Sequence, residues 1–207
     1  MTKSGRPDKN ASTVSEANAS EYPAGQDPAR WSVLIVLLVA LFMSLISVSI
    51  VNVALPSIQA GLDASDSDVQ WVLSGYALTF GVVLVAAGRA GDLVGRGGIF
   101  LVGIAIYTLA SASAGFAPNA ESLNLSRFIQ GIGAGLLNPQ GVGMIQQYFR
   151  GAERGRAFGY FGSTVGVAVA IGPVLSGFLI RIGGADLGWR LTMLVNFPIG
   201  LLAIVLG

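Results

Sequence analysis

Long hydrophobic stretches separated by short polar links make up the chain after its first 30 residues. The first stretch, residues 31–55, contains no charged side chain. A helix rises about 1.5 Å per residue, so this stretch is long enough to cross a membrane core of ~30 Å. Five more stretches follow, at residues 69–87, 99–116, 123–148, 157–180 and 191–207. They are longer than barrel strands, so the pattern predicts six transmembrane helices in an all-α membrane protein.

The segment before the first stretch has a different character. Residues 1–30 are rich in Ala, Ser and Asn, and their basic and acidic side chains balance. A segment of this composition cannot bury enough apolar surface to offset the entropy that ordering would remove. We therefore expect residues 1–30 to form a disordered tail.

Composition agrees with a membrane protein and narrows its chemistry. Of the 207 residues, 53% are hydrophobic and 11% are charged, whereas a soluble domain carries roughly 25% charged residues. The chain has no Cys and no His, which excludes disulfides, thiolate nucleophiles, His-based catalysis and the commonest metal ligands. We expect no enzyme activity, no metal, no cofactor and no nucleic-acid partner.

The charges in the polar links predict how the helices cross the membrane. The links after the second and fourth stretches are basic, with Arg89, Arg96, Arg150, Arg154 and Arg156. The links after the first and third stretches are acidic, with Asp63, Asp66, Asp68 and Glu121. Because basic links remain in the cytoplasm, we expect a multi-pass plasma-membrane protein with a cytoplasmic amino terminus. Arg181 and Arg190 fall on the outer side and are exceptions to this division.

The link between the second and third stretches contains a glycine-rich charged motif. Its key residues are Gly88, Asp92, Gly95 and Arg96. The glycines permit a tight turn, and the two charged side chains can pair or cap helix ends. Taken alone, the segment favours a solvated charged turn. The string resembles the G-x-x-x-D-x-x-G-R loop of the major facilitator superfamily, and the resemblance implies an inner gate.

The fourth stretch contains Arg127, the one ionisable side chain that lies inside a hydrophobic stretch rather than at its edge. An intramembrane charge is a functional candidate by default. On a helix, Arg127 shares a face with Gly131, Gly135 and Asn138. The alternative is a structural Arg whose head group reaches the outer interface. Arg127 and Gln130 also match the superfamily's fourth-span motif, whose Arg is associated with proton coupling.

The fifth stretch has a face of small residues. Gly159, Gly172, Pro173 and Gly177 lie on or beside it, where they allow close approach of another helix or a bend. Ordinary helix packing also explains this pattern. The same residues resemble the antiporter motif of drug:proton exchangers.

Two further strings are similar to the fourteen-span branch of those exchangers. One ends the first stretch at Asn52, and the other opens the sixth with Trp189, Arg190, Asn196 and Pro198. The branch usually has an Asp five positions before the Asn, where this chain has Ser47. A hydroxyl cannot carry a proton at neutral pH as a carboxylate can. Coupling would then rely on a carboxylate elsewhere in the protein, or transport would be uncoupled or differently coupled.

Together these resemblances imply the amino-terminal half of a major facilitator fold, residues 31–207, built from 3+3 inverted repeats. The sixth span is expected to be truncated. The implied function is efflux of hydrophobic or cationic small molecules by alternating access, with protons as the candidate driving ion. Arg127, Gln130 and Asn52 would line the cavity, and Ser47 would occupy the vacant coupling position. The alternative is a truncated or split membrane subunit that is inactive until a carboxy-terminal half is supplied in cis or in trans.

Overall fold

The computed structural model describes residues 29–206, and most of the segment expected to be a disordered tail lies outside this range. Its last two residues, Ala29 and Arg30, belong to the first described helix. Every regular element in the described range is an α-helix. The helices are α2 (Ala29–Leu62), α3 (Asp66–Val94), α4 (Arg96–Gly115), α5 (Ala120–Tyr148), α6 (Gly151–Leu194) and α7 (Asn196–Leu206). The all-α prediction is confirmed.

The last two expected spans meet at a sharp turn inside α6. Gly184 has φ +68° and ψ −165°, a backbone conformation that glycine adopts far more readily than other residues. The chain reverses there, so the fifth helix ends at Gly184 and the next apolar helix runs Asp186–Leu206. The sixth helix therefore begins earlier than the hydrophobic stretch starting at residue 191 indicated.

Five helices within residues 29–206 are long and apolar enough to cross a membrane, and α5 is not among them. Its 29 residues would cover about 44 Å, so length is sufficient. The helix is more polar because it carries Arg127, several amides and many glycines. These residues are mostly buried, and α5 packs along both α3 and α4. Neighbouring helices thus supply the surroundings that a lipid-facing helix would obtain from apolar side chains.

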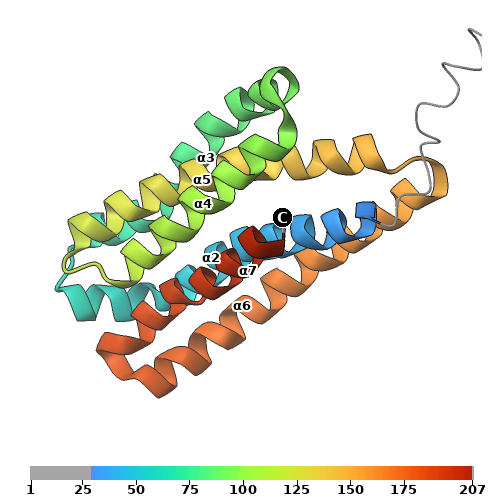
Figure 1. The fold of residues 1–207 in the computed structure, drawn as a ribbon. Coiled ribbons are helices and arrows are strands. Elements are labelled where there is room, and N and C mark those ends of the chain that lie inside the picture. Colours follow the sequence, from blue (N-terminus) through green and yellow to red (C-terminus); the bar gives the residue numbers. More distant parts are fainter. Residues whose placement is uncertain (1–28, 207) are drawn as a thin grey trace, which may run out of the picture.

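The helix pairs follow an internal symmetry. The most extensive contacts join α2 to α6, α3 to α5 and α4 to α5, and α7 packs on α4 and α2. Figure 1 shows α3, α4 and α5 on one side, and α2, α6 and α7 on the other. When the first three helices are exchanged in order with the last three, these pairs map onto one another. This is the pattern expected of a 3+3 repeat.

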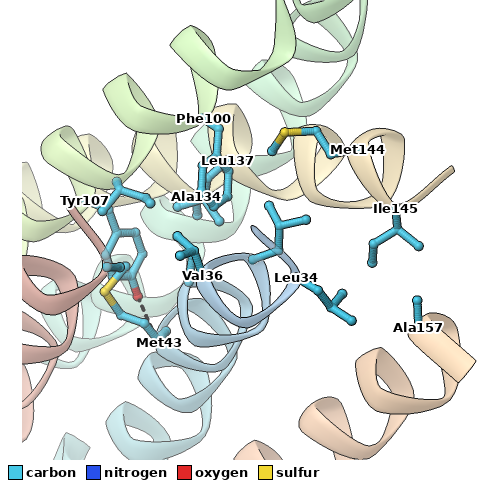
Figure 2. Packing of buried hydrophobic residues seen from close by; sticks show 14 of the residues in the cluster. Leu34, Val36, Met43, Phe100, Tyr107, Ala134, Leu137, Met144, Ile145 and Ala157 are labelled. Carbon is cyan, nitrogen blue, oxygen red and sulfur yellow. Dashed lines mark hydrogen bonds between the residues drawn. The ribbon is translucent and has the colours of Figure 1, made fainter. Parts of the chain in front are cut away.

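A core of apolar side chains joins the two groups of helices (Figure 2). Leu34 and Val36 of α2 belong to the same buried cluster as Phe100 of α4 and Leu137 of α5. Tyr107 of α4 lies in this cluster and donates a hydrogen bond across it to the Met43 carbonyl, at 3.2 Å. This core fixes α2 against α4 and α5.

The outer surface is also apolar. Large hydrophobic side chains are strongly exposed on several helices, among them Val85 at 78%, Leu109 at 67% and Val174 at 73%. A soluble protein rarely presents so continuous an apolar surface to water. The lipid bilayer is the environment that these side chains fit.

Candidate functional site

Helix α5 carries Arg127 into the interior of the bundle. The helix begins after Asn119, whose side chain accepts a hydrogen bond from the Ser122 backbone amide and whose backbone amide donates one to the Ser122 hydroxyl. Arg127 follows about two turns later, and its side chain is completely buried. It does not reach the outer interface, so the structure favours the intramembrane-charge interpretation.

The Arg127 guanidinium is held by hydrogen bonds from three helices. Nε donates to the Val72 carbonyl of α3 at 3.0 Å. Nη1 donates to the Ser47 hydroxyl of α2 at 3.2 Å and to Gln130 Oε1 of α5 at 2.6 Å. The Tyr76 ring lies over the guanidinium, with 4.4 Å between Cζ and the ring centroid. These contacts offset part of the free energy that burial of the charge costs.

One edge of this network is open. Among the described residues, neither Arg127 Nη2 nor Gln130 Nε2 has a hydrogen-bond partner, and both atoms are buried. Buried donors are nearly always hydrogen-bonded in native proteins. Two buried donors without a partner therefore indicate a place where water or a ligand can bind. The unpaired atoms of this network are therefore N–H donors.

An apolar cavity of about 360 Å³ adjoins this network between α2, α3 and α5. Its walls are formed by Ser44, Leu45, Val48, Asn52, Leu73, Tyr76, Ala77, Phe80, Arg127 and Asn138. Asn52 lies on the wall and uses Nδ2 to bond the Val48 carbonyl at 2.9 Å. Ser47 and Gln130 are fully buried and lie behind the wall, where they contact Arg127. The structure thus brings the four expected cavity and coupling residues to one place.

Sequence reasoning missed several members of this cavity. Tyr76 and Phe80 of α3 are stacked in parallel, with ring centroids 6.2 Å apart. Asn138 donates to the Ser44 hydroxyl at 3.1 Å, and that hydroxyl lies 3.5 Å from the Tyr76 hydroxyl. A signal existed, because Ser44 lies one turn before Ser47 and Asn138 shares the helical face of Arg127. This helical spacing alone did not distinguish Ser44 and Asn138 from other polar positions in the spans.

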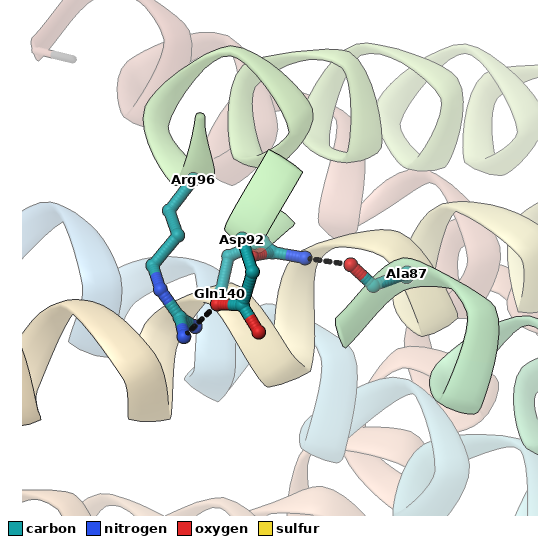
Figure 3. A network of polar contacts seen from close by, with 4 residues as sticks. All are labelled: Ala87, Asp92, Arg96 and Gln140. Atoms are coloured by element: carbon teal, nitrogen blue, oxygen red, sulfur yellow. Dashed lines mark hydrogen bonds and ion pairs between the residues drawn. The ribbon is translucent and has the colours of Figure 1, made fainter. Parts of the chain in front are cut away.

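The motif between α3 and α4 forms a compact polar contact at the end of the bundle (Figure 3). Arg96 Nη2 lies 2.5 Å from Asp92 Oδ1. Gly95, with φ +110°, separates the two helices. Gln140 of α5 donates from Nε2 to the Ala87 carbonyl of α3 at 2.7 Å. This contact fixes the α3–α4 turn on α5.

Two glycines leave room for the side chains of this contact. A Cβ at Gly143 would overlap the Arg96 guanidinium, and a Cβ at Gly91 would overlap the Gln140 amide. Gly88 is less constrained, since an added Cβ would make only an ordinary contact with Pro139, at 3.9 Å. The Arg96 side chain therefore lies on the α5 backbone rather than in solvent.

The glycine motif of the fifth span divides into two environments. Gly172 is buried against α2, and a Cβ there would lie 2.5 Å from Ser49 Cβ. Gly159, Pro173 and Gly177 are exposed, and an added Cβ at either glycine would meet nothing within 4 Å. One side of the motif packs inside this chain, and the other side faces outward.

The sixth-span motif fastens the bundle at its other end. Trp189 is fully buried, and Arg190 lies over its ring with 4.4 Å from Cζ to the centroid. Arg190 also donates to the carbonyls of Gly115 and Ala117, at 3.2 and 2.8 Å. Asn196 is fully buried, whereas Pro198 is exposed. Arg190 thus binds the end of α4, which explains a basic residue on the side expected to be acidic.

Metal chemistry has no candidate site in residues 29–206. No three acidic, His or Cys side chains gather in this range in a way that could hold a metal ion.

The described architecture matches known membrane transporters. A family model described as Major Facilitator Superfamily matches residues 37–207. The chain belongs to this superfamily. It is 42% identical over 184 residues to the "Probable actinorhodin transporter" of Streptomyces coelicolor, covering 88% of this chain and 32% of that protein. It is 39% identical over 201 residues to the puromycin resistance protein pur8 of Streptomyces alboniger, covering 97% of this chain and 38% of that protein.

A solved transporter structure has a similar arrangement of helices. The inward-facing, occupied crystal structure of a bacterial homologue of the human lysosomal transporter Spinster aligns with a TM-score of 0.72 at 25% identity. The alignment covers 88% of this chain and 44% of that one. The chain spans about a third of the length of the two curated relatives. The names of these two relatives agree with the resemblance to drug exporters of the superfamily that the sequence motifs indicated.

Proposed function

We propose that this chain forms the amino-terminal half of an efflux transporter for small hydrophobic molecules in the plasma membrane. The observation that carries the proposal is the apolar cavity between α2, α3 and α5, adjoined by the buried guanidinium of Arg127. Such a cavity suits a substrate that partitions into lipid and has a few polar groups. The relatives described as a probable actinorhodin transporter and a puromycin resistance protein support export as the direction.

Transport in this proposal proceeds by alternating access. Six-helix halves of the superfamily rock against each other around a central site. The exposed side of the α6 motif, with Gly159 and Gly177, is the surface on which a second half would pack closely. The Asp92–Arg96 contact would hold the inner end of α3 and α4 while that end is closed. The basic links support a cytoplasmic amino terminus.

A proton gradient is the proposed driving force. No carboxylate hydrogen-bonds to Arg127 within residues 29–206, because Ser47 occupies the position expected of an Asp. Proton exchange therefore needs a carboxylate from the other half of the transporter. Counting protons moved per substrate molecule in reconstituted vesicles of the complete transporter tests this coupling.

Substitution of Arg127 tests the site itself. In the complete transporter, Arg127→Ala should abolish substrate extrusion and leave membrane insertion intact, because it removes the cavity's charge and its hydrogen bonds to two other helices. Efflux into inverted vesicles is the measurement. Arg89→Ala, at an exposed position outside the cavity, is the matched control. Wild-type efflux by Arg127→Ala would rule out the assigned role.

A second candidate is a split membrane subunit that has no activity until a partner half is supplied. The outward-facing glycines of α6 are compatible with it, because they suit a helix from another polypeptide as well as one from the same chain. It predicts no transport by this polypeptide alone and transport after co-expression with a carboxy-terminal half. Transport by the 207-residue polypeptide alone would exclude it.

A further inference from the structure

The charge pattern around the cavity points to a substrate class. We infer that this half of the site prefers planar aromatic molecules with an anionic or acceptor group and disfavours permanent cations. The inference rests on the proposed transport function and narrows the substrates expected from resemblance, which included cationic ones. Three features of the described residues carry it: an unpaired buried donor, an uncompensated positive charge, and an aromatic wall already engaged by a cation.

The donor is Arg127 Nη2. It is buried and has no partner in the described part of the chain, while Nε and Nη1 are bonded. Gln130 Nε2, a neutral donor beside it, is also unpaired. Of these two residues only Arg127 lines the cavity, so an oxygen from a substrate would complete the hydrogen bonds of Arg127. Hydrogen bonds from charged donors are the stronger ones. A cationic substrate offers no such acceptor with its charged group.

The positive charge has no counter-ion in its surroundings. The acidic residues of the described range lie at helix ends or in links: Asp63, Asp66, Asp68, Asp92, Glu121, Glu153 and Asp186. None of them lines the cavity. The Ser47 hydroxyl, 3.2 Å from Nη1, lies where a carboxylate could pair with the guanidinium. The cavity wall is mostly apolar, so the field of the guanidinium is weakly screened and attracts anions.

The aromatic wall consists of Tyr76 and Phe80. Their rings are parallel to within 2°, and both line the cavity. Aromatic rings attract cations to their faces, but Arg127 already lies over Tyr76. A second cation brought to this wall would be repelled by the first. A planar aromatic substrate can still stack on the wall through apolar contact.

Two dyes with the same xanthene ring and opposite charge provide the test. Fluorescein is anionic and rhodamine 6G is cationic at neutral pH. Binding of each to the complete transporter in nanodiscs is followed by fluorescence anisotropy. We expect fluorescein to bind about tenfold more tightly than rhodamine 6G. Arg127→Gln should remove that preference.

Ser47→Asp is the sharper variant, because it keeps Arg127 and adds only its counter-ion. It should reduce fluorescein binding and increase rhodamine 6G binding, reversing the order. Arg89→Gln removes one exposed positive charge outside the cavity and should leave both affinities unchanged. Size-exclusion profiles of all variants confirm that each is folded before binding is measured.

Several outcomes overturn the inference: tighter binding of rhodamine 6G than of fluorescein to the wild type, no binding of either dye, or an unchanged ratio in Ser47→Asp. Efflux measured on the same preparations separates the two proposals. If the wild type shows efflux but Ser47→Asp leaves the ratio of the two dye affinities unchanged, the proposed substrate class is rejected and the proposed transport function stands. If both dyes bind as expected but no efflux is measured, the proposed binding preference stands and the proposed transport function is rejected.

Discussion

Arg127 lies in an apolar bundle because its hydrogen bonds come from three different helices. Val72, Ser47 and Gln130 each supply an acceptor, and the Tyr76 ring covers one face of the guanidinium. A buried charge without such partners would be expelled or neutralised. One residue therefore requires a specific arrangement of α2, α3 and α5 around it.

Glycines determine how closely α4 and α5 approach. A Cβ at Gly103 would lie 2.9 Å from the Leu137 amide nitrogen, and a Cβ at Gly133 would lie 2.7 Å from the Tyr107 amide nitrogen. These neighbours are backbone atoms, which cannot rotate away as side-chain ends can. The two helices are thus packed backbone against backbone.

The first residue-scale prediction concerns Gly103. Gly103→Val should destabilise the fold by about 1–3 kcal/mol, because the added methyl groups force α4 away from α5. Gly81→Val is the matched control, since a Cβ at Gly81 meets nothing within 4 Å. Unfolding of the detergent-solubilised protein, followed by far-UV circular dichroism, measures the difference. Equal midpoints for the two variants would contradict the close contact.

Helix ends are decided by local backbone geometry rather than by hydrophobicity. At the scale of the element, α3 ends and α4 begins at Gly95, with φ +110°. Asp92 and Arg96, on either side of this break, are in contact. Gly184 plays the corresponding role inside α6.

Gly95→Ala tests the α3–α4 break. Alanine at this φ should cost about 1–3 kcal/mol and disturb the Asp92–Arg96 pair. Gly97→Ala, at the second residue of α4 in an exposed position with open space around it, should be neutral or slightly stabilising. Thermal unfolding of both variants in the same detergent is the measurement. A Gly95→Ala protein as stable as the wild type would show that the turn adapts.

At the scale of the whole molecule, packing follows the exchange symmetry of two three-helix repeats. Contacts of α2 with α6 correspond to those of α5 with α3, and α4 with α5 corresponds to α7 with α2. Neighbours in the bundle therefore come from different repeats. Folding of either repeat alone would leave its inner faces uncovered.

The orientation predicted from the charges of the links can be tested directly. The chain has no Cys, so a single introduced Cys reports alone. Ser67→Cys, at the start of α3, should react with a membrane-impermeant maleimide added outside intact cells. Gly97→Cys, at the start of α4, should react only after permeabilisation. Labelling of both positions from outside, or the reverse order, would reject a cytoplasmic amino terminus.

Much of the fold could be read from the sequence, because crossing a membrane imposes a length and an apolar composition on each helix. The stretches at residues 31–55 and 99–116 correspond closely to α2 and α4 in their apolar parts. Boundaries were less well determined. The sixth helix begins at Asp186 because the turn at Gly184 depends on backbone torsion, which hydrophobicity does not report.

The sequence by itself determined that the chain is an all-helical membrane protein and that Arg127 is its one ionisable side chain inside a hydrophobic stretch. Only the tertiary structure decided what that charge contacts. Ser47, Tyr76 and Asn138 come from three helices, and their approach to the cavity depends on the packing of whole helices. Helical periodicity places residues on a face, but the rotation of each helix against its neighbours is set by contacts distant in sequence.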